Sequence, residues 1–376
     1  QPISDICETI TDYTAAGSFA DVAKNVKYIN NGVGYSQLIR TTDLKSKFEN
    51  RDKFVYVDEH AFNYLWRVNL NVEGLILPNV GNCGEVYYVT KDTFVHEKNV
   101  LGPNSIWVRS NTVDNKYLYY IFLATEFQRK LIKIITTTGQ TKFNKTNFKN
   151  LTVPVPPLEV QREIVRILDS FTLLTAELTA ELTARKKQYE YYRDILLVPP
   201  CDDVEKISLS DVVSIKNGKD YKHLKDGKYP VYGSGGIMTY KSEYTYDKPS
   251  VLIPRKGSLS NLFYVEEPFW NVDTVFYTEV NESKLIPNYL YYLLQKEHLE
   301  SLNTAGGVPS LTQTILNKLN LTIPSLNRQI KIVDCLDNFE KICNDLNIGL
   351  PAEIEARKKQ YEYYIDVLLT FAETGS

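Results

Sequence analysis

The chain has 376 residues, of which 43% are hydrophobic, and its formal net charge at pH 7 is −3. This length predicts at least two domains with buried cores, and no apolar run reaches the roughly eighteen residues of a transmembrane helix. The charge excludes a polycation that binds nucleic acid through its overall charge, so binding to DNA would need local basic patches or a partner with a positive surface.

Cysteine and histidine usage does not indicate a metal centre. The five cysteines follow no C-x-x-C pattern, and the four histidines have no metal-ligand spacing. An odd number of unpatterned cysteines is typical of a reducing cytoplasm, and the N-terminal residues lack the pattern of a secretory signal. Nucleotide-binding glycine motifs are also missing. The sequence therefore predicts a cytoplasmic chain with no metal or cofactor of its own and no visible catalytic site.

The first 157 residues predict a mixed α/β domain. In chain order we expect a short helix over residues 3–14, a strand running into a polar loop over 35–44, a strand–loop–strand over 71–89, a helix over 117–135 and a polar loop over 136–145. Glycines in the loop 78–84 would let the backbone approach another molecule closely. The lysines after residue 139 could contact phosphates, and a solvated connector is the alternative.

Residues 158–197 predict one long helix that begins after Pro156-Pro157. Apolar residues recur at spacings of four and three from Ile164 to Leu196, interrupted only at Thr175 and Arg185, which predicts a heptad seam. Such a helix would be about 60 Å long. Its middle contains the tandem TAEL-TAEL-TA, in which each unit adds about one turn, or about 6 Å; a simple helix-forming spacer is the alternative.

The rest of the chain predicts a second domain and a second helix. Lysines recur at every third position from Lys216 to Lys228, and a second strand–loop–strand follows over residues 250–265. Residues 326–376 continue a heptad pattern, but Gly349 and Pro351 interrupt it. We therefore expect a break or kink there, with Pro351 at the start of a new helix.

An internal repeat links the two halves of the chain. Residues 184–197, ARKKQYEYYRDILL, return as residues 356–369, ARKKQYEYYIDVLL, with twelve of fourteen positions identical. Upstream, residues 139–171 align on residues 307–339 without a gap. The match is weaker further back, where Pro78 and Gly81 correspond to Pro254 and Gly257. Such a repeat predicts two similar structural units.

Two heptad helices in one chain bury their seams most simply on each other. An antiparallel pair would place the two globular domains at opposite ends with approximate two-fold symmetry. Two heads at a fixed separation suit a two-part target, and a DNA duplex offers equivalent groove faces about 34 Å apart. The repeat also predicts two equivalent docking surfaces, and hence two copies of a partner.

This layout resembles the specificity (S) subunit of type I restriction–modification systems. The resemblance covers the whole chain. It is carried by the alternation of two dissimilar (variable) segments, residues 1–157 and 198–325, with two repeated (constant) segments, residues 158–197 and 326–376, and by the boundary segments VPVPPLEVQREIVRILD and TIPSLNRQIKIVDCLD. The TAEL tandem resembles the subgroup in which the copy number of the unit sets the gap between half-sites. The family resemblance implies an α+β fold with two target-recognition domains, residues 1–157 and 198–325. These would be separated by two antiparallel spacer helices, residues 158–197 and 326–376, that form a pseudo-two-fold coiled coil.

The resemblance also implies a non-catalytic subunit. Each globular domain would read one half of a split, asymmetric sequence in double-stranded DNA. Two modification subunits would carry S-adenosylmethionine and methylate adenine at N6, which requires base flipping. Restriction subunits dependent on ATP and Mg²⁺ would join through them. Such partners could also supply the positive surface that this chain lacks.

Candidate contact residues follow from loop positions. For DNA, the candidates in the first domain are Arg40, Thr41, Thr42, Asn79, Gly81, Asn82, Gln140, Lys142 and Lys145, and those in the second are Lys219, Tyr232, Gly233, Ser234, Arg255, Lys256, Ser258 and Gln313. Arg255 could offer a planar fork to a guanine edge or bind phosphate. For partner proteins, the candidates are Arg185, Lys186, Lys187, Tyr189, Arg357, Lys358, Lys359 and Tyr361. The alternatives are ordinary solvated loops and charges at the edge of the helical seam.

Two other functions remain open on the residues alone. A two-headed coiled-coil scaffold that binds only proteins would show apolar patches on its heads rather than basic grooves. A self-sufficient nuclease or methyltransferase would need a carboxylate cluster or a cofactor pocket, and the sequence shows neither.

Overall fold

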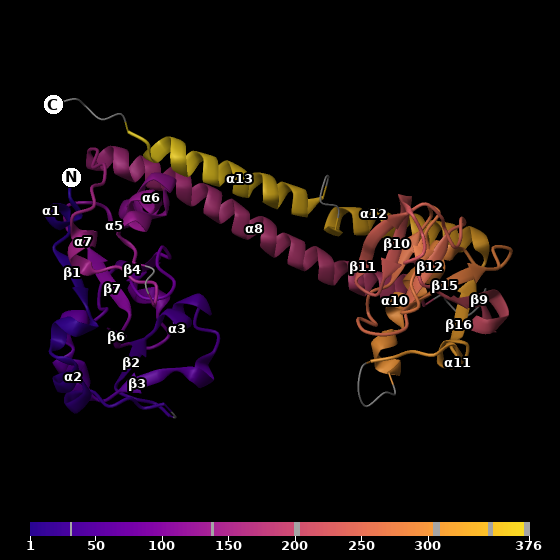
Figure 1. Ribbon diagram of the computed structural model, residues 1–376, viewed down its shortest axis with the longest axis horizontal. Helices are drawn as coiled ribbons and strands as arrows, with labels where there is room; N and C mark the ends of the chain where they lie inside the picture. The colour runs from indigo at the N-terminus through magenta and orange to yellow at the C-terminus, as the bar shows by residue number, and fades with distance from the viewer. Residues whose placement is uncertain (31, 137–138, 199–203, 304–308, 345–348, 372–376) are drawn as a thin grey trace. The chain divides into compact units, whose positions relative to one another are not determined.

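The computed structural model describes the chain except residues 31, 137–138, 199–203, 304–308, 345–348 and 372–376, and the side chain of Phe19. The described residues form two compact units (Figure 1). Unit 1 consists of Gln1–Ala176 and Glu355–Ser376, and unit 2 of Glu177–Ile354. Both combine helices with largely antiparallel sheets, so the chain is a two-unit α+β protein.

The larger sheet of unit 1 has four antiparallel strands in the order β1-β7-β4-β5. They are β1 (Thr9–Asp12), β4 (Gly74–Pro78), β5 (Tyr87–Val89) and β7 (Ser105–Arg109). Helix α5 (Asn115–Leu123) packs on β4 and β5. The Asp114 side chain caps this helix by accepting hydrogen bonds from the backbone N–H groups of Lys116 and Tyr117. Tyr117 and Tyr120 are buried in the core beneath it.

A smaller sheet in unit 1 has its own core. Its order is β3-β2-β6, and β2 runs antiparallel to β3 but parallel to β6. Apolar side chains from this sheet and from the short helices beside it are buried together. The elements are β2 (Ser36–Ile39), β3 (Val55–Val57), β6 (Asn99–Leu101), α2 (Phe19–Asn25), α3 (Thr41–Lys45) and α4 (Glu59–Tyr64). The remaining short helices of unit 1 are α1 (Ile3–Ile6), α6 (Thr125–Ile134) and α7 (Lys145–Lys149).

Unit 2 repeats both sheets. Its larger sheet has the order β13-β12-β15-β9, and its smaller sheet has the order β11-β10-β14 with β10 parallel to β14. In the larger sheet, β9, β15, β12 and β13 take the places of β1, β7, β4 and β5 of unit 1. In the smaller sheet, β11, β10 and β14 take the places of β3, β2 and β6. The strands are β8 (Val204–Ser208), β9 (Val213–Asn217), β10 (Asp226–Gly233), β11 (Gly236–Lys241), β12 (Ser250–Pro254), β13 (Phe263–Val265), β14 (Trp270–Asn271), β15 (Val275–Val280) and β16 (Asn320–Pro324). The short helices are α9 (Leu209–Val212), α10 (Pro287–Lys296) and α11 (Gln313–Leu316).

The constant segments are helical, as predicted. Helix α8 (Leu158–Leu196) is continuous over 39 residues, whereas the second segment forms α12 (Leu326–Asn344) and α13 (Leu350–Leu369). The expected break is therefore present, with Pro351 at the second position of α13, where a missing backbone N–H is tolerated. Both predicted strand–loop–strand segments are also confirmed, as β4 with β5 and as β12 with β13. The sequence also predicts that Pro199 and Pro200 end the first long helix, but residues 199–203 lie outside the described residues.

Three local predictions were wrong. Within residues 3–14 the only α-helix is the short α1, because the β-branched residues after it pair as β1 with β7, about a hundred residues away, and Tyr13 begins a 3-10 helix. The polar loop expected after β2 is the helix α3, so Thr41 and Thr42 lie in its first turn. The single helix expected over residues 117–135 is two helices, α5 and α6, divided at Ala124, whose backbone is extended.

The described part of the chain contains no helix that is long and apolar enough to cross a membrane. Within the same residues, no three histidine, cysteine, aspartate or glutamate side chains are grouped so that they could hold a metal ion. The four described cysteines, Cys7, Cys83, Cys335 and Cys343, are free thiols.

Candidate nucleic-acid interface and partner surfaces

Two of the predicted DNA-contact loops of unit 1 lie together. The backbone N–H of Gly81 donates to the Thr141 carbonyl at 2.8 Å, and Val80 forms an isolated β-bridge with Lys142. Gly81 has a φ of +84°, which a residue with a Cβ rarely adopts, so glycine is favoured at this turn. The pairing leaves Gly81, Asn82, Gln140 and Lys142 exposed around one pair of loops.

Unit 2 builds the same pair of loops with different side chains. Gly257 has a φ of +87°, its N–H donates to the Pro309 carbonyl at 3.2 Å, and Lys256 bridges Ser310. The turn between β10 and β11 also lies here, because a Cβ on Gly257 would be 3.2 Å from the Ser234 Oγ. The predicted residues Ser234, Lys256 and Ser258 are therefore brought together, with Lys256 and Ser258 exposed.

Several predicted DNA contacts are already engaged within the chain. The Arg40 guanidinium makes two hydrogen bonds to the Asp43 carboxylate, at 3.1 and 2.8 Å, and a third to the Lys53 carbonyl at 2.6 Å. Lys145 lies on α7, and its ammonium pairs with Asp12 at 3.1 Å. Either side chain would have to leave these partners to reach a base. We therefore regard Arg40 and Lys145 as weaker candidates than the exposed residues of the paired loops.

The remaining candidates in unit 2 differ in exposure. Lys219 is exposed, and the Arg255 side chain is half-buried with its guanidinium 5.7 Å from the centre of the Phe276 ring. Tyr232 is half-buried and packs edge-on against Phe269, so much of its ring belongs to the core.

Two further candidates of unit 2 are less accessible. Gly233 is buried at the end of β10. The Gln313 amide is half-buried and reaches the Asn217 side chain at 3.5 Å. Neither position offers a freely exposed side chain, so the loop that contains Lys256 is the better candidate.

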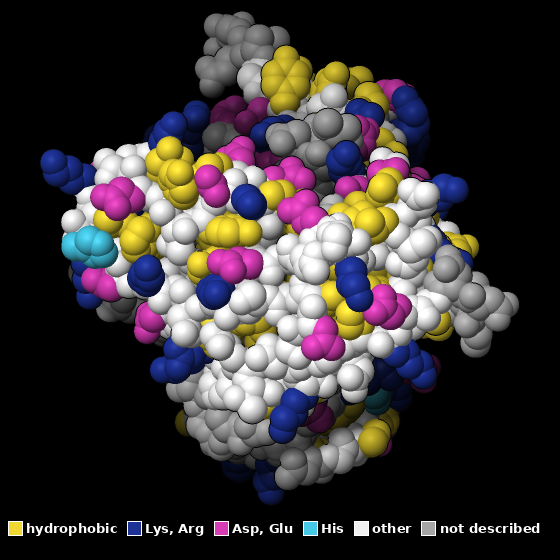
Figure 2. Space-filling view, turned by 90° about the vertical axis from the view of Figure 1, so that its right-hand side faces the viewer, with side chains coloured by type: hydrophobic (Ala, Val, Ile, Leu, Met, Phe, Trp, Pro, Cys, Tyr) yellow, Lys and Arg dark blue, Asp and Glu magenta, His cyan; other side chains and the backbone are white. Residues whose placement is uncertain are grey.

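The face shown in Figure 2 has no continuous basic patch of the kind that binds nucleic acid, because its Lys and Arg side chains are interspersed with Asp, Glu and hydrophobic ones. Mixed charge of this kind gives no strong electrostatic attraction to a phosphate backbone. Any DNA contact on this face must therefore depend on individual side chains.

One glutamine in each unit joins the head to the start of the constant helix. The Gln161 Oε1 accepts from the backbone N–H of Asp114 at 2.9 Å, and its Nε2 donates to the Pro156 carbonyl at 2.7 Å. In unit 2, the Gln329 Oε1 accepts from the N–H of Ile286 at 2.9 Å, and its Nε2 donates to the Pro324 carbonyl at 2.9 Å. Both glutamines are almost fully buried.

A tyrosine–aspartate pair makes a second repeated joint. The Tyr120 hydroxyl donates to the Asp169 carboxylate at 2.6 Å, and the Tyr292 hydroxyl donates to the Asp337 carboxylate. Burial and these carboxylates raise the pKa of both tyrosines well above its usual value, so both remain neutral donors. Each head is thus fixed to its helix by the same chemistry.

Aromatic contacts between the constant helices are also repeated. In unit 1, Phe171 of α8 stacks on Tyr364 of α13, with ring centres 5.1 Å apart. In unit 2, the ring centre of Tyr192 of α8 lies 6.0 Å from that of Phe339 of α12. In the internal repeat Phe171 corresponds to Phe339 and Tyr192 to Tyr364, so each copy's phenylalanine contacts the other copy's tyrosine.

The predicted partner-contact residues fall into two groups. Tyr189 and Tyr361 are half-buried, Tyr189 donating to the Gln295 side chain at 3.3 Å and Tyr361 packing against the core of unit 1. Burial raises the pKa of Tyr361 to about 12. The charged candidates that are exposed on the helices are Arg185, Lys186, Lys187, Lys358 and Lys359, whereas Arg357 is half-buried and bonds to Gln360 at 2.7 Å. The exposed charged group is therefore better placed to meet a partner.

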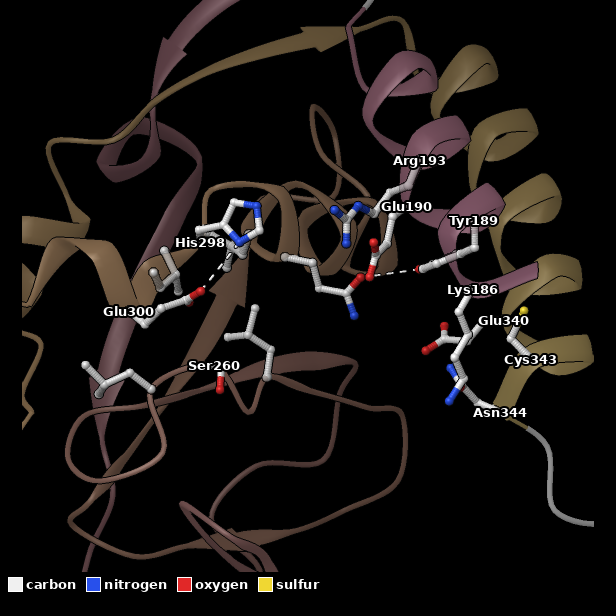
Figure 3. A pocket seen from close by; sticks show the side chains of 15 residues that line it. Lys186, Tyr189, Glu190, Arg193, Ser260, His298, Glu300, Glu340, Cys343 and Asn344 are labelled. Atoms are coloured by element: carbon white, nitrogen blue, oxygen red, sulfur yellow. Dashed lines mark hydrogen bonds and ion pairs between the residues drawn. The ribbon is translucent and has the colours of Figure 1, made fainter. Parts of the chain in front are cut away.

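Two of these candidates line a cavity of about 340 Å³ in unit 2, between α8, α12 and the end of α10 (Figure 3). Figure 3 shows Lys186, Tyr189 and Arg193 extending from α8 toward this cavity, with Glu340 and Cys343 on α12. The described lining carries both cationic and anionic side chains, and it includes no pair arranged like a nucleophile and its base. The cavity therefore gives no indication of catalysis.

The wall of this cavity marks a difference between the two copies of the repeat. Arg193 is buried and pairs with Asp194 at 2.8 Å. The corresponding residue in unit 1 is Ile365, which is buried in the apolar core. One of the two substitutions within the repeated segment ARKKQYEYYRDILL thus replaces an apolar contact by an ion pair.

Sequence reasoning missed an exposed apolar surface on the constant helices. Tyr191 and Tyr363, which correspond in the repeat, are both 63% exposed. Ile195 and Val367 also correspond, and both are 49% exposed one turn further along. These four positions lie outside the heptad seam, yet corresponding positions carry tyrosine or aliphatic side chains of the same kind in both copies of the repeat. This agreement between the copies could have identified them from the sequence.

Comparisons with known proteins agree with this layout. The family model described as the type I restriction modification DNA specificity domain matches residues 2–185 and 201–356. A type I restriction enzyme specificity subunit of Haemophilus influenzae is 32% identical over 69% of this chain and 73% of its own length. A type I specificity subunit of Mycoplasma pneumoniae is 34% identical over 57% of this chain and 91% of its own length.

Solved structures support the fold. A type I restriction–modification S subunit from M. genitalium matches with a TM-score of 0.55 at 15% identity, over 99% of this chain and 96% of the other. A chain from a study of complex assembly of the type I R-M system matches with a TM-score of 0.63 at 14% identity, over 98% and 96%. Since the family model covers most of the residues, the chain belongs to the type I restriction–modification DNA specificity family and is a non-catalytic specificity subunit.

Proposed function

We propose that each head reads one half of a bipartite, asymmetric DNA sequence. The observation that carries this proposal is that both heads present the same glycine loop with different side chains. Asn79-Val-Gly-Asn82 in unit 1 becomes Arg255-Lys-Gly-Ser258 in unit 2. Asparagine pairs well with adenine, and arginine pairs well with guanine. One scaffold with two sets of side chains suits a target whose halves differ.

The constant helices form, in this proposal, an antiparallel coiled-coil spacer with pseudo-two-fold symmetry. The reciprocal contacts of Phe171 with Tyr364 and of Tyr192 with Phe339 support it, because antiparallel copies bring each element against the other copy's counterpart. The target-recognition domains are then residues 1–157 and 198–325, and the spacer helices are residues 158–197 and 326–376.

The proposed partners are two adenine-N6 methyltransferase subunits, which dock on the two copies of the repeat. The matched exposure of Tyr191 and Tyr363 supports two equivalent surfaces. S-adenosylmethionine would be bound by these subunits, and ATP and Mg²⁺ by restriction subunits that join through them. Such an assembly would work in the cytoplasm, where the chromosome is accessible.

Half-site variants test the proposal. The chain would be co-expressed with its modification subunit, and methylated adenines would be mapped in the cellular DNA. We expect Asn82→Ala with Lys142→Ala to relax or abolish one half of the methylated motif only, and Lys256→Ala with Ser258→Ala to affect the other half only. Val33→Ala, an exposed change elsewhere on unit 1, is the matched control. Equal effects of both double variants on both halves would contradict the assignment of one half-site to each head.

A further inference from the structure

Unit 1 holds one of its own lysines in an aromatic and acidic niche. The Lys116 Nζ lies 2.7 Å from the Asp169 Oδ2 and 5.7 Å from the centre of the Tyr88 ring. The ring centre of Tyr119 lies 6.1 Å from that of Tyr88, and Tyr120 donates to the other oxygen of Asp169. The niche thus supplies an ion pair and an aromatic face, two contacts that favour an ammonium group.

Unit 2 has the same niche without the lysine. The three tyrosines correspond to Tyr264, Tyr291 and Tyr292, with ring centres 6.3 Å apart for the first pair and 5.3 Å for the second. Asp337 corresponds to Asp169 and accepts from Tyr292. Asn288 replaces the lysine, and its neutral amide lies 3.1 and 3.2 Å from the two Asp337 oxygens.

The niche of unit 2 is also more acidic. Glu340 replaces Thr172 of unit 1, and the two residues after β13 are glutamates, where Thr90 and Lys91 follow β5. Glu266, Glu267, Glu340 and Asp337 line an open cavity of about 550 Å³. Lys341 is the one cationic side chain among the described lining residues, and it is exposed.

Two carboxylates here share one hydroxyl group. The Tyr292 hydroxyl donates to Asp337 and lies 3.0 Å from the Glu340 Oε2. Burial raises the pKa of Glu340, and the negative charge of Asp337 raises it further. An incoming cation would therefore relieve a repulsion between carboxylates that unit 1 avoids.

We propose that this cavity of unit 2 receives a lysine side chain of the modification subunit. The inference rests on the proposed function, since it assumes that this subunit docks beside α12. In unit 1 the corresponding niche already holds the ammonium group of Lys116, and the acidic lining of the cavity in unit 2 complements a positive charge. The two docking surfaces then share their exposed tyrosines but differ at this niche, because unit 1 fills its own niche and unit 2 leaves its niche to the partner.

The test gives the niche of unit 2 the lysine and the threonine that unit 1 has at two corresponding positions. Purified Asn288→Lys/Glu340→Thr protein and wild-type protein would be titrated with the modification subunit and followed by native mass spectrometry. We expect binding of one modification subunit to be unchanged and binding of the second to weaken about tenfold or more, the scale of one lost desolvated charge pair. Unchanged affinity for both copies would overturn the inference.

A matched variant and a cross-linking measurement complete the test. Lys116→Asn opens the niche of unit 1 and should not weaken binding of the second copy. In wild-type complexes, a zero-length carbodiimide cross-linker should join a lysine of the modification subunit to Glu340 or Glu267, and cross-links that avoid this cavity would overturn the inference even if the double variant failed to fold. If wild-type protein bound no modification subunit at all, the proposed function itself would fail.

Discussion

At the scale of single residues, the joints between heads and helices depend on groups that satisfy several partners at once. Gln329 accepts one backbone hydrogen bond and donates two, to the Pro324 and Lys284 carbonyls, while fully buried. A buried amide in such a place leaves several polar groups unsatisfied when it is removed. The glutamine in each copy is therefore explained by the geometry of the joint.

Gln329→Ala should lower the free energy of unfolding by about 1–3 kcal/mol, because the Ile286 N–H and the two carbonyls lose their partner. Urea unfolding followed by circular dichroism measures the change. Lys331→Ala, an exposed change on the same helix, is the control. A loss no larger than that of the control would show that water replaces the glutamine at little cost.

The free energy of unfolding should depend on pH because of Glu340, and the raised pKa of this residue sets the direction of the dependence. Burial raises its folded-state pKa above the usual 4.5, so the folded protein binds more protons than the unfolded chain between these two values. Its contribution to stability is therefore present at low pH and is lost as pH rises through the raised pKa. The stability of Glu340→Gln relative to wild type should increase over this window when urea unfolding is compared between low and neutral pH. A difference that does not change with pH would contradict the assignment.

The exposed tyrosines of the constant helices give a third prediction. Tyr191→Ala with Tyr363→Ala should weaken association with the modification subunit by about 2 kcal/mol or more per site, the scale of interface hot spots. No matching loss of stability is expected, since both side chains are 63% exposed. Binding titrations and thermal unfolding separate the two effects. Unchanged binding would remove these residues from the partner surface.

At the scale of elements, the long constant helices could be predicted because their signal is local. Heptad spacing over some forty residues indicated α8, and Gly349 with Pro351 located the break before α13. The strand in residues 3–14 could not be predicted, because β1 depends on pairing with β7, far away in the sequence. For the candidate site, glycines located the loops. The engagement of Arg40 by Asp43 depends on the fold of α3, which the sequence pattern did not indicate.

The TAEL tandem gives a prediction about the length of helix α8. Adding one TAEL unit to α8 should lengthen the helix by about 6 Å, and so widen the gap between methylated half-sites by about one to two base pairs at about 3.4 Å each. Mapping methylated adenines in cells that express each variant measures the gap. Replacement of one unit by another helix-forming tetrapeptide of equal length is the control and should leave the gap unchanged. A constant gap after the insertion would contradict a ruler.

At the scale of the whole molecule, the chain repeats one topology and one set of joints but varies what the heads display. Both larger sheets share a strand order, and both heads use a glutamine and a tyrosine–aspartate pair to meet their helices. The differences include the side chains of the glycine loops and the niche of Asn288, where reading and docking are proposed. A subunit that confers sequence specificity on shared partner subunits needs a repeated framework with different contact residues in its two heads, and this chain has that arrangement.

The most direct test is to sequence the methylated DNA of cells that express the wild-type chain with its modification subunit and no other adenine methyltransferase. We expect N6-methyladenine in both halves of a split, asymmetric motif with a fixed gap. A stable complex that methylates a continuous motif, or that methylates nothing, would contradict the claim that the two heads each read half of one site.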